Sequence, residues 1–149
     1  MKATARAGAN IALTKYWGKR DTKLMLPQNS SISVTFKEFH ATTTVEFSKK
    51  FKKDLLILNG KKAQDKELKK LQKPLNEVRK LSNLNLKAKI VSKNNFPTAA
   101  GLSSSSAGLG AFALASTKAA GLNLSKAKLS IIARLGSGSA TRSVFGVFA

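Results

Sequence analysis

The chain has 149 residues, of which 42% are hydrophobic and 23% charged, and it contains no cysteine and a single histidine, His40. This length is enough for one buried core but leaves no room for two ordinary domains. The sequence has no run of about 18 apolar residues that could span a bilayer, and it lacks an apolar signal segment. We therefore expect one cytoplasmic domain over residues 1–149, with no membrane partner, no disulfides and no zinc site.

The charge is strongly unbalanced, because 27 Lys and Arg residues stand against 7 Asp and Glu residues and give a formal net charge of +20. Such a balance favours phosphates or polyanions as partners. No acidic residue follows Glu77 in the sequence. A reaction in the second half of the chain that needs a carboxylate must therefore take it from the first half or from another chain.

Four short stretches in the first hundred residues have the sequence pattern of β-strands. In three of them apolar residues alternate with polar ones, and the fourth is an apolar run that ends at an Asn-Gly turn. We predict strands at 32–36, 43–47, 55–58 and 84–90. The first two are interpreted as an antiparallel pair.

Three later stretches have the pattern of helices. Leucines recur at spacings of three and four from Asp65 to about Leu81, and the lysines of this block are interpreted as a solvent-facing surface. A segment over 102–120 is rich in Ala and Leu, and Ser125 begins another apolar-periodic helix that runs to Leu135. Strands that precede helices in this way indicate an α+β fold.

The segment from Pro97 to Gly108, PTAAGLSSSSAG, carries the strongest chemical signal. Small residues let backbone amides close around an anion at the start of a long helix, and serine hydroxyls bind phosphate oxygens or Mg²⁺. The alternative is a serine-rich cap on a core helix. Gly108 and Gly110 lie inside the helix, so they are interpreted as close-packing positions and not as a dinucleotide fingerprint, and the Walker pattern is absent.

Two other segments combine cations with small or aromatic residues. Residues 10–21, NIALTKYWGKRD, hold either a binding site on an alternating strand or two core aromatics, Tyr16 and Trp17, whose neighbouring lysines reach water. Residues 136–143, GSGSATRS, either bind a second anion or form a flexible connector. In the first case the planar guanidinium of Arg142 suits a carboxylate, which it can hold through two parallel bonds.

Together, and in this order, these segments resemble the mevalonate diphosphate decarboxylase family of the GHMP kinase superfamily. The matching motifs are NIA and KYWGKRD within 10–21, LPQNSSISVT at 26–35, NFPTAAGL at 95–102, and GSGSA at 136–140 followed by Arg142. The resemblance covers the whole chain but only about the N-terminal half of the usual enzyme. It implies an α+β domain of the GHMP kinase N-terminal type, with a mixed sheet and helices on one face.

The resemblance also implies an activity, the ATP-dependent decarboxylation of mevalonate 5-diphosphate to isopentenyl diphosphate, with ATP and Mg²⁺ as cofactors. The tertiary hydroxyl of this small phosphorylated hydroxy acid is phosphorylated first, and departure of that phosphate drives loss of CO₂. Decarboxylation of mevalonate 5-phosphate and phosphorylation of the 3-hydroxyl alone are alternatives within the same fold. The rival from another class is a basic nucleic-acid-binding domain, which only the net charge supports, so we do not expect nucleic acid as a partner.

Positions that match the family's motifs receive its roles. The implied catalytic residues are Lys15, Ser105 and Arg142, and Ser105 is also the implied magnesium ligand. The implied substrate-binding residues are Asn10, Tyr16, Lys19, Ser137, Ser139 and Arg142. The implied ATP-binding residues are Pro97, Ala100, Gly101, Leu102, Ser103, Ser104, Ser105 and Ser106.

The sequence departs from the family pattern in two ways. Single residues differ at Ser103, Ser106, Thr141 and Val147. The family's catalytic aspartate belongs to the C-terminal half, and Asp21 is part of another motif. Because residues 144–149 form an apolar end that a partner would cover, we expect one subunit of a split enzyme, inactive without an acidic second chain that supplies the aspartate. A truncated enzyme and a remnant with a binding role are the alternatives.

Overall fold

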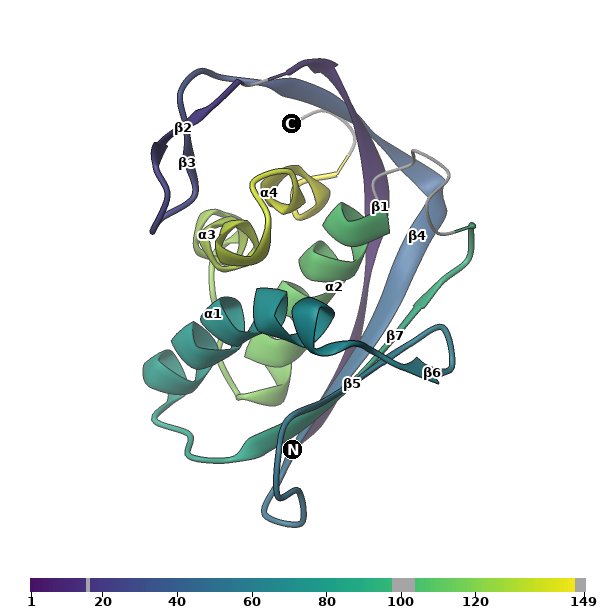
Figure 1. The fold of residues 1–149 in the computed structure, drawn as a ribbon, viewed down its shortest axis with the longest axis vertical. Helices are drawn as coiled ribbons and strands as arrows, with labels where there is room; N and C mark the ends of the chain where they lie inside the picture. The colour runs from purple at the N-terminus through teal and green to yellow at the C-terminus, as the bar shows by residue number, and fades with distance from the viewer. Residues whose placement is uncertain (16, 98–103, 147–149) are drawn as a thin grey trace.

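The structure, a computed structural model, describes residues 1–15, 17–97 and 104–146. Figure 1 shows the long strands on one side of the molecule and the helices on the other, with two short strands set apart from the long ones. In chain order the elements are β1 (Lys2–Thr14), β2 (Lys19–Asp21), β3 (Leu26–Pro27), β4 (Ile32–Ser48), β5 (Leu55–Leu58), β6 (Lys61–Lys62), α1 (Asp65–Ser82), β7 (Lys87–Asn94), α2 (Ser104–Ala119), α3 (Lys126–Gly136) and α4 (Ala140–Ser143).

The main sheet has five strands in the order β1-β4-β7-β5-β6. β5 and β7 are parallel, while the other neighbours are antiparallel. A parallel pair needs a crossover connection, and α1 supplies it between β5 and β7. β2 and β3 form a separate two-stranded ladder. The mixed sheet expected from the resemblance is therefore confirmed.

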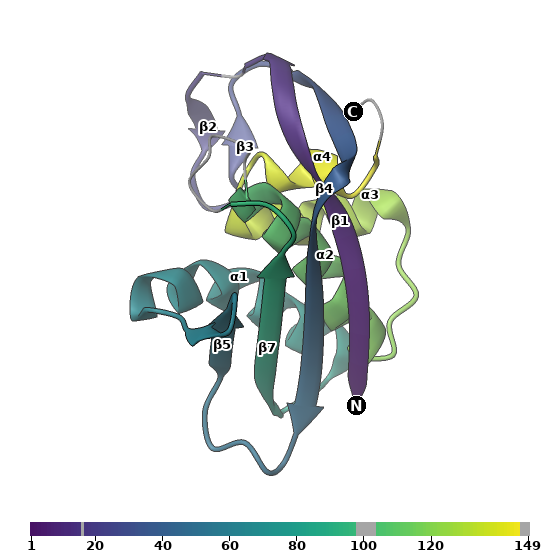
Figure 2. The same ribbon diagram turned by 90° about the vertical axis from the view of Figure 1, so that its right-hand side faces the viewer.

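All four helices cover the same face of this sheet, as the resemblance implied (Figure 2). α2 packs against β1 and β4, and α3 and α4 pack against α2 in turn. A helix enclosed in this way needs small side chains. A Cβ atom added to Gly110 would lie 2.9 Å from the Cβ of Ser143 and 3.3 Å from that of Ala7, so the predicted close-packing role is confirmed for this glycine.

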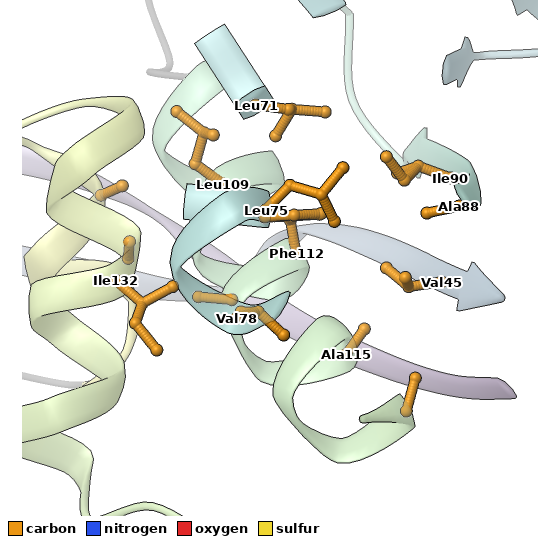
Figure 3. Packing of buried hydrophobic residues seen from close by; sticks show 14 of the residues in the cluster. Val45, Leu71, Leu75, Val78, Ala88, Ile90, Leu109, Phe112, Ala115 and Ile132 are labelled. Atoms are coloured by element: carbon orange, nitrogen blue, oxygen red, sulfur yellow. The ribbon is translucent and has the colours of Figure 1, made fainter. Parts of the chain in front are cut away.

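The main hydrophobic core lies between the sheet, α1 and α2 (Figure 3). Val45 and Ile90 point inward from the sheet, and Leu75 and Phe112 meet them from α1 and α2. Each of these side chains is almost completely buried, which contributes about 1.5–3 kcal/mol per residue. The core fixes α2 against the sheet, and α2 carries the serine-rich segment at its start.

The helix ends agree with the sequence signals. α1 begins with a capping box in which the Gln64 amide donates to Glu67 Oε2 over 2.8 Å, and it ends at Asn83 in the left-handed conformation. Ser125 caps α3, as predicted, and accepts a hydrogen bond from the Lys128 amide. In the described part of the chain, no helix is long and apolar enough to cross a membrane.

The predicted pair of strands at 32–36 and 43–47 is wrong, because both stretches belong to the single 17-residue strand β4. Gly8 of β1 pairs with His40 and Asn10 pairs with Thr35, so the intervening residues of β4 form a bulge. A bulge preserves alternation on both sides and needs no turn residue, which is why the pattern resembled a hairpin. Gly8 permits this arrangement, since a Cβ there would lie 2.4 Å from the carbonyl oxygen of Phe36.

Two other strands differ from the sequence prediction. β1 was not predicted, because its run of Ala, Thr and Gly lacks the large β-formers. β7 lies at 87–94 and not at 84–90, because Leu84 and Leu86 pack against the core from the connection that precedes the strand. The alternation was detected correctly, but the predicted strand starts at residue 84 and the observed strand starts at Lys87.

Candidate functional site

The guanidinium of Arg142 on α4 is held by two residues from distant parts of the chain. Its Nη1 donates to Ser31 Oγ over 2.7 Å, and its Nη2 and Nε donate to Asn10 Oδ1 over 3.2 and 3.4 Å. Asn10 lies on β1 and is completely buried. Arg142 is thus fixed in orientation, which suits a planar group that binds an anion through parallel hydrogen bonds.

The other end of the Asn10 side chain is also engaged within the protein. Its Nδ2 donates to the Ser139 carbonyl over 3.1 Å and to Ser143 Oγ over 2.7 Å. Both donor and acceptor groups of the amide therefore have partners in α4 and the turn before it. The structure gives Asn10 a positioning role toward Arg142, and its implied contact with substrate stays a prediction.

Three serine hydroxyls join the start of α2 to the turn before α4. Ser139 Oγ is hydrogen-bonded to Ser106 Oγ, and it lies 3.1 Å from Ser137 Oγ. Ser106 is buried in the first turn of α2. The segments 97–108 and 136–143 therefore meet, although the sequence could not show it. The interpretation of 136–143 as a flexible connector is wrong, because this segment contains α4.

Asn29 holds the backbone at Lys15 and Trp17. Asn29 Oδ1 accepts a hydrogen bond from the Trp17 amide over 3.0 Å, and Asn29 Nδ2 donates to the Lys15 carbonyl over 3.4 Å. Lys15 and Lys19 are exposed. Trp17 is 80% exposed, so its interpretation as a core residue is wrong. The strand alternation expected here is also wrong, because the strand covers 19–21 only.

Asp21, close to these cations, already has a structural task. Its Oδ1 accepts a hydrogen bond from the Leu24 amide over 2.8 Å, which fixes the connection between β2 and β3. Among the described residues, His, Asp and Glu side chains form no group of three that could hold a metal ion. Arg142, Lys15 and Lys19 each carry hydrogen-bond donors and positive charge that suit an anionic ligand.

A cavity of about 590 Å³ opens between the β5–β6 hairpin, the first turns of α1 and the start of α2. Its apolar wall includes Leu56, Ile90 and Phe112. The hydroxyls of Thr43 and Ser92, 2.9 Å apart, add a polar group to the lining. This volume is in the range of small-molecule binding sites, and the wall suits a flat apolar ring with a few polar atoms.

Positive and hydroxyl groups line the mouth of the same cavity. Lys61, Lys62 and Lys70 come from β6 and α1, and Ser104 and Ser105 come from the first turn of α2. The free amides and dipole of a helix N-terminus favour phosphate at that point. The cavity can therefore accommodate a nucleotide, with its base against the apolar wall and its phosphates at α2. Ser105, the implied magnesium ligand, lines this cavity, and its role toward Mg²⁺ stays a prediction.

Sequence reasoning missed the cavity lysines. The solvent-facing lysines predicted on the 65–81 helix are confirmed, because Lys66, Lys69, Lys73 and Lys80 are exposed. The prediction did not show that Lys70, together with Lys61 and Lys62, also lines a cavity. The only local signal was the Asn59–Gly60 turn directly before two of them. In the structure Asn59 Oδ1 accepts a hydrogen bond from the Asn94 amide over 2.9 Å, which fixes this turn at the cavity rim.

The structure describes four of the predicted ATP-binding residues, and they differ in position. Ser104 and Ser105 line the cavity, whereas Ser106 faces Ser139. Pro97 is exposed before the serine-rich segment. The other predicted positions, in this segment and in the N-terminal motif, lie outside the described residues: Tyr16, Ala100, Gly101, Leu102 and Ser103.

Comparisons with known proteins give a consistent result. A family model described as the diphosphomevalonate decarboxylase-like N-terminal domain matches residues 7–149. The diphosphomevalonate decarboxylase of Ganoderma lucidum is 47% identical over 163 residues, which cover 99% of this chain and 40% of that protein. The human diphosphomevalonate decarboxylase is 44% identical over 161 residues, which cover 97% of this chain and 39% of that protein.

Solved structures match equally well. A mevalonate diphosphate decarboxylase from Enterococcus faecalis superimposes with a TM-score of 0.93 at 49% identity, over 99% of this chain and 46% of that chain. A structure described as MDDEF in complex with MVAPP, AMPPCP and magnesium has the same TM-score and identity and is covered to 45%. This chain thus spans less than half the length of these relatives.

Proposed function

Because this chain belongs to the diphosphomevalonate decarboxylase family, whose members have the GHMP kinase fold, we propose that it forms the ATP- and substrate-binding half of such an enzyme. The reaction is the ATP-dependent conversion of mevalonate 5-diphosphate to isopentenyl diphosphate, CO₂, ADP and phosphate. The observation that carries this proposal is the first turn of α2. There Ser105 lines the nucleotide-sized cavity, and the adjacent Ser106 is bonded to the turn that precedes Arg142.

ATP is assigned to the cavity between β6, α1 and α2. Lys61, Lys62 and Lys70 supply positive charge at its mouth, and Ser104 and Ser105 supply hydroxyls beside the helix N-terminus. These groups bind phosphate oxygens, and Ser105 is the candidate ligand of Mg²⁺. When bound, ATP supplies the phosphoryl group that is transferred to the tertiary hydroxyl of the substrate.

The substrate is assigned to the opposite side of this turn. Arg142, whose orientation Asn10 and Ser31 fix, binds the carboxylate. Lys19 binds the phosphate end, and Lys15 lines the same cleft. Holding the carboxylate in place keeps its C–C bond aligned with the C–O bond that breaks. Departure of the transferred phosphate then leaves the electron pair of the C–C bond to form the new double bond as CO₂ is released. Fixed donors stabilise this charge movement without reorganising.

The carboxylate that activates the tertiary hydroxyl is assigned to an acidic second half. Asp21 is engaged in its own turn, and no acidic residue follows Glu77. Exposed apolar side chains near the site support a covering partner, namely Leu13 at 64% and Ile32 at 52% exposure. At the predicted apolar end, Val144 packs into the core of this chain, while Phe145 is exposed. The partner belongs in the same compartment, which we propose is the cytoplasm.

The decisive experiment combines this chain with the C-terminal half of a relative and offers three substrates. We expect ATP-dependent CO₂ release from mevalonate 5-diphosphate and much less from mevalonate 5-phosphate or mevalonate. Ser105→Ala should abolish most of this turnover, while Ser48→Ala, a control outside the cavity at the opposite end of the sheet, should not. ADP release without CO₂ from every substrate would replace decarboxylation with 3-hydroxyl phosphorylation. CO₂ from the monophosphate alone would change the substrate.

A further inference from the structure

In the described part of the chain, no helix covers one face of the main sheet, and Figure 2 looks onto this face. Side chains alternate between the two faces of a strand. On β7, Ala88, Ile90 and Ser92 are buried toward the helices, so Lys87, Lys89, Val91 and Lys93 point to the open face. Three of the four outward positions of this central strand are therefore lysines.

The strand register extends this charge across the sheet. Lys93 lies beside Thr42 of β4, which in turn lies beside Arg6 of β1. Two rows further along, Glu46 of β4 lies between Lys89 and Lys2. The row between these two contains Val91, Thr44 and Thr4, and the two threonine hydroxyls are 2.8 Å apart. Cations thus line both sides of a strip of hydroxyls, and Glu46 is the only carboxylate in these three rows.

The connection from β4 to β5 adds four more lysines at one end of this face. Lys49, Lys50, Lys52 and Lys53 are all exposed. The acidic residue of this connection does not neutralise them, because Asp54 turns inward. Its carboxylate binds Arg79 at 2.5 Å and the Ala88 amide at 2.8 Å. The lysines of this loop therefore carry uncompensated positive charge.

We propose that the open face of the sheet, together with the β4–β5 loop, binds the phosphate backbone of a nucleic acid. Outward neighbours along a strand are about 6.6 Å apart, so the β7 lysines form a regular row of point charges. Lysine ammonium groups and threonine hydroxyls both bind phosphate oxygens, and neither selects a base in this arrangement. No outward residue in the rows of Lys89, Val91 and Lys93 is aromatic, so bases have no stacking platform there. Binding is therefore independent of base sequence.

The composition of the face favours a nucleic acid over the other polyanionic surfaces. Protein interfaces have an apolar or aromatic centre, and here the centre is a row of threonines beside Val91. Membrane binding needs an inserted apolar side chain, but Phe51 in the lysine loop is half-buried. Nucleic-acid interfaces are polar, wet and strongly positive, which describes this face.

This surface is separate from the ATP cavity. The cavity lies on the helix side of the sheet, where Thr43 and Ser92 point into it, while the outward Lys93 and Thr42 flank them on the opposite face. Much of the positive charge, which the sequence alone could not assign to a surface, thus lies on the open face of the sheet and the β4–β5 loop. We therefore expect this chain to bind a nucleic acid as a second ligand, in addition to ATP and substrate. This expectation does not depend on the proposed enzymatic function.

The test is a titration of labelled single-stranded RNA of mixed sequence with the natural chain, followed by fluorescence anisotropy between about 50 and 200 mM salt. The variant carries Lys87→Gln, Lys89→Gln and Lys93→Gln. Its matched control carries Lys66→Gln, Lys69→Gln and Lys73→Gln, three exposed lysines of α1 with the same total charge. Circular dichroism verifies that both fold.

We expect the β7 variant to lose at least about tenfold in affinity, and its salt slope to fall by about 2, or about 0.7 for each lost phosphate contact. The control should stay within about twofold, and excess ATP should not displace the RNA. Equal losses in both variants, or displacement by ATP, would overturn the proposal. It would also fail if polyglutamate competed as well as RNA at equal charge, or if anionic vesicles bound with the same dependence on the β7 lysines.

Discussion

The Arg142 region and the nucleotide cavity are organised by different means. At Arg142, the orientation of one charged group is fixed by hydrogen bonds to Asn10 and Ser31, and Asn10 is fully buried. At the cavity, Lys61, Lys62 and Lys70 are exposed, and the shape comes from the sheet, α1 and the start of α2. The first region holds the Arg142 guanidinium in one orientation. The cavity has a packed wall, and its charged groups are exposed lysine side chains.

Because of this difference, we expect substitutions in the two regions to have effects of different size. Removing a buried hydrogen-bond partner leaves other groups unsatisfied, so substitutions around Arg142 affect both stability and chemistry. Removing one exposed lysine loses a screened attraction and leaves the wall intact. The contrast fits their proposed tasks, since the carboxylate of the substrate must be held in one orientation, whereas a triphosphate can be bound by several adaptable cations.

The largest effect is expected from Asn10→Ala. This substitution leaves the guanidinium of Arg142 and the hydroxyl of Ser143 without their buried partner, so the free energy of unfolding should fall by about 2–4 kcal/mol. Urea unfolding measures it. Asn29→Ala, which removes hydrogen bonds at the surface, is the control and should cost about 1 kcal/mol. Equal losses in the two variants would contradict the distinction between a rigid and an adaptable region.

Two glycines of α2 sharpen the comparison, because Gly110 faces α4 and Gly108 lines the cavity. Gly110→Ala places a methyl group 2.9 Å from Ser143, and this overpacking exceeds the gain in helix propensity, for a net loss of about 1–2 kcal/mol. Gly108→Ala meets only Ser92 Oγ at 3.8 Å, so it should stabilise by up to about 1 kcal/mol. Thermal unfolding of both variants tests the sign; a stabilising Gly110→Ala would refute the close packing of α2 on α4.

Arg142→Lys tests whether geometry or charge matters at the rigid region. Lysine keeps the charge but cannot form two parallel bonds or replace the contacts to Ser31 and Asn10. Turnover of the reconstituted enzyme should fall by at least about tenfold, which corresponds to about 1.4 kcal/mol. Steady-state CO₂ release measures it, with Arg134→Lys on α3 as the control. Unchanged kinetics would remove Arg142 from the site.

The smallest effect is expected from Lys61→Gln at the cavity mouth. Because Lys61 is exposed, its loss should weaken ATP binding by about two- to fivefold, corresponding to under about 1 kcal/mol, and the loss should shrink at high salt. Titration with a fluorescent ATP analogue gives the affinity. Lys66→Gln, on the same side of the molecule but outside the cavity, should change nothing. A loss that persists at high salt would indicate a rigid, desolvated lysine instead.

Local signals in the sequence were sufficient for the helices. The spacing of leucines after Asp65 and the cap at Ser125 are properties of neighbouring residues, so the bounds of α1 and α3 followed. The serine-rich start of α2 was equally local. By contrast, β4 contains a bulge that depends on pairing with Gly8, and no residue inside β4 encodes that pairing.

The assembly of the site could not be read from the sequence without the family resemblance. Asn10, Ser31 and Arg142 are separated by more than a hundred residues between the first and the last, and only the packing of α4 against β1 joins them. The cavity lysines were missed for the same reason. A lysine on a helix has the same local pattern whether it faces water or a cavity, and the position of α2 decides which.

The central claim is that this chain holds the binding groups of the reaction but lacks the carboxylate that activates the hydroxyl. The most direct test is ATP-dependent CO₂ release from mevalonate 5-diphosphate by the purified chain alone, with contaminating partner excluded by mass spectrometry. We predict no release by the chain alone and robust release after an acidic C-terminal half is added. Robust turnover by the chain alone would contradict the account and would require a base within it, with Asp21 as the first residue to substitute.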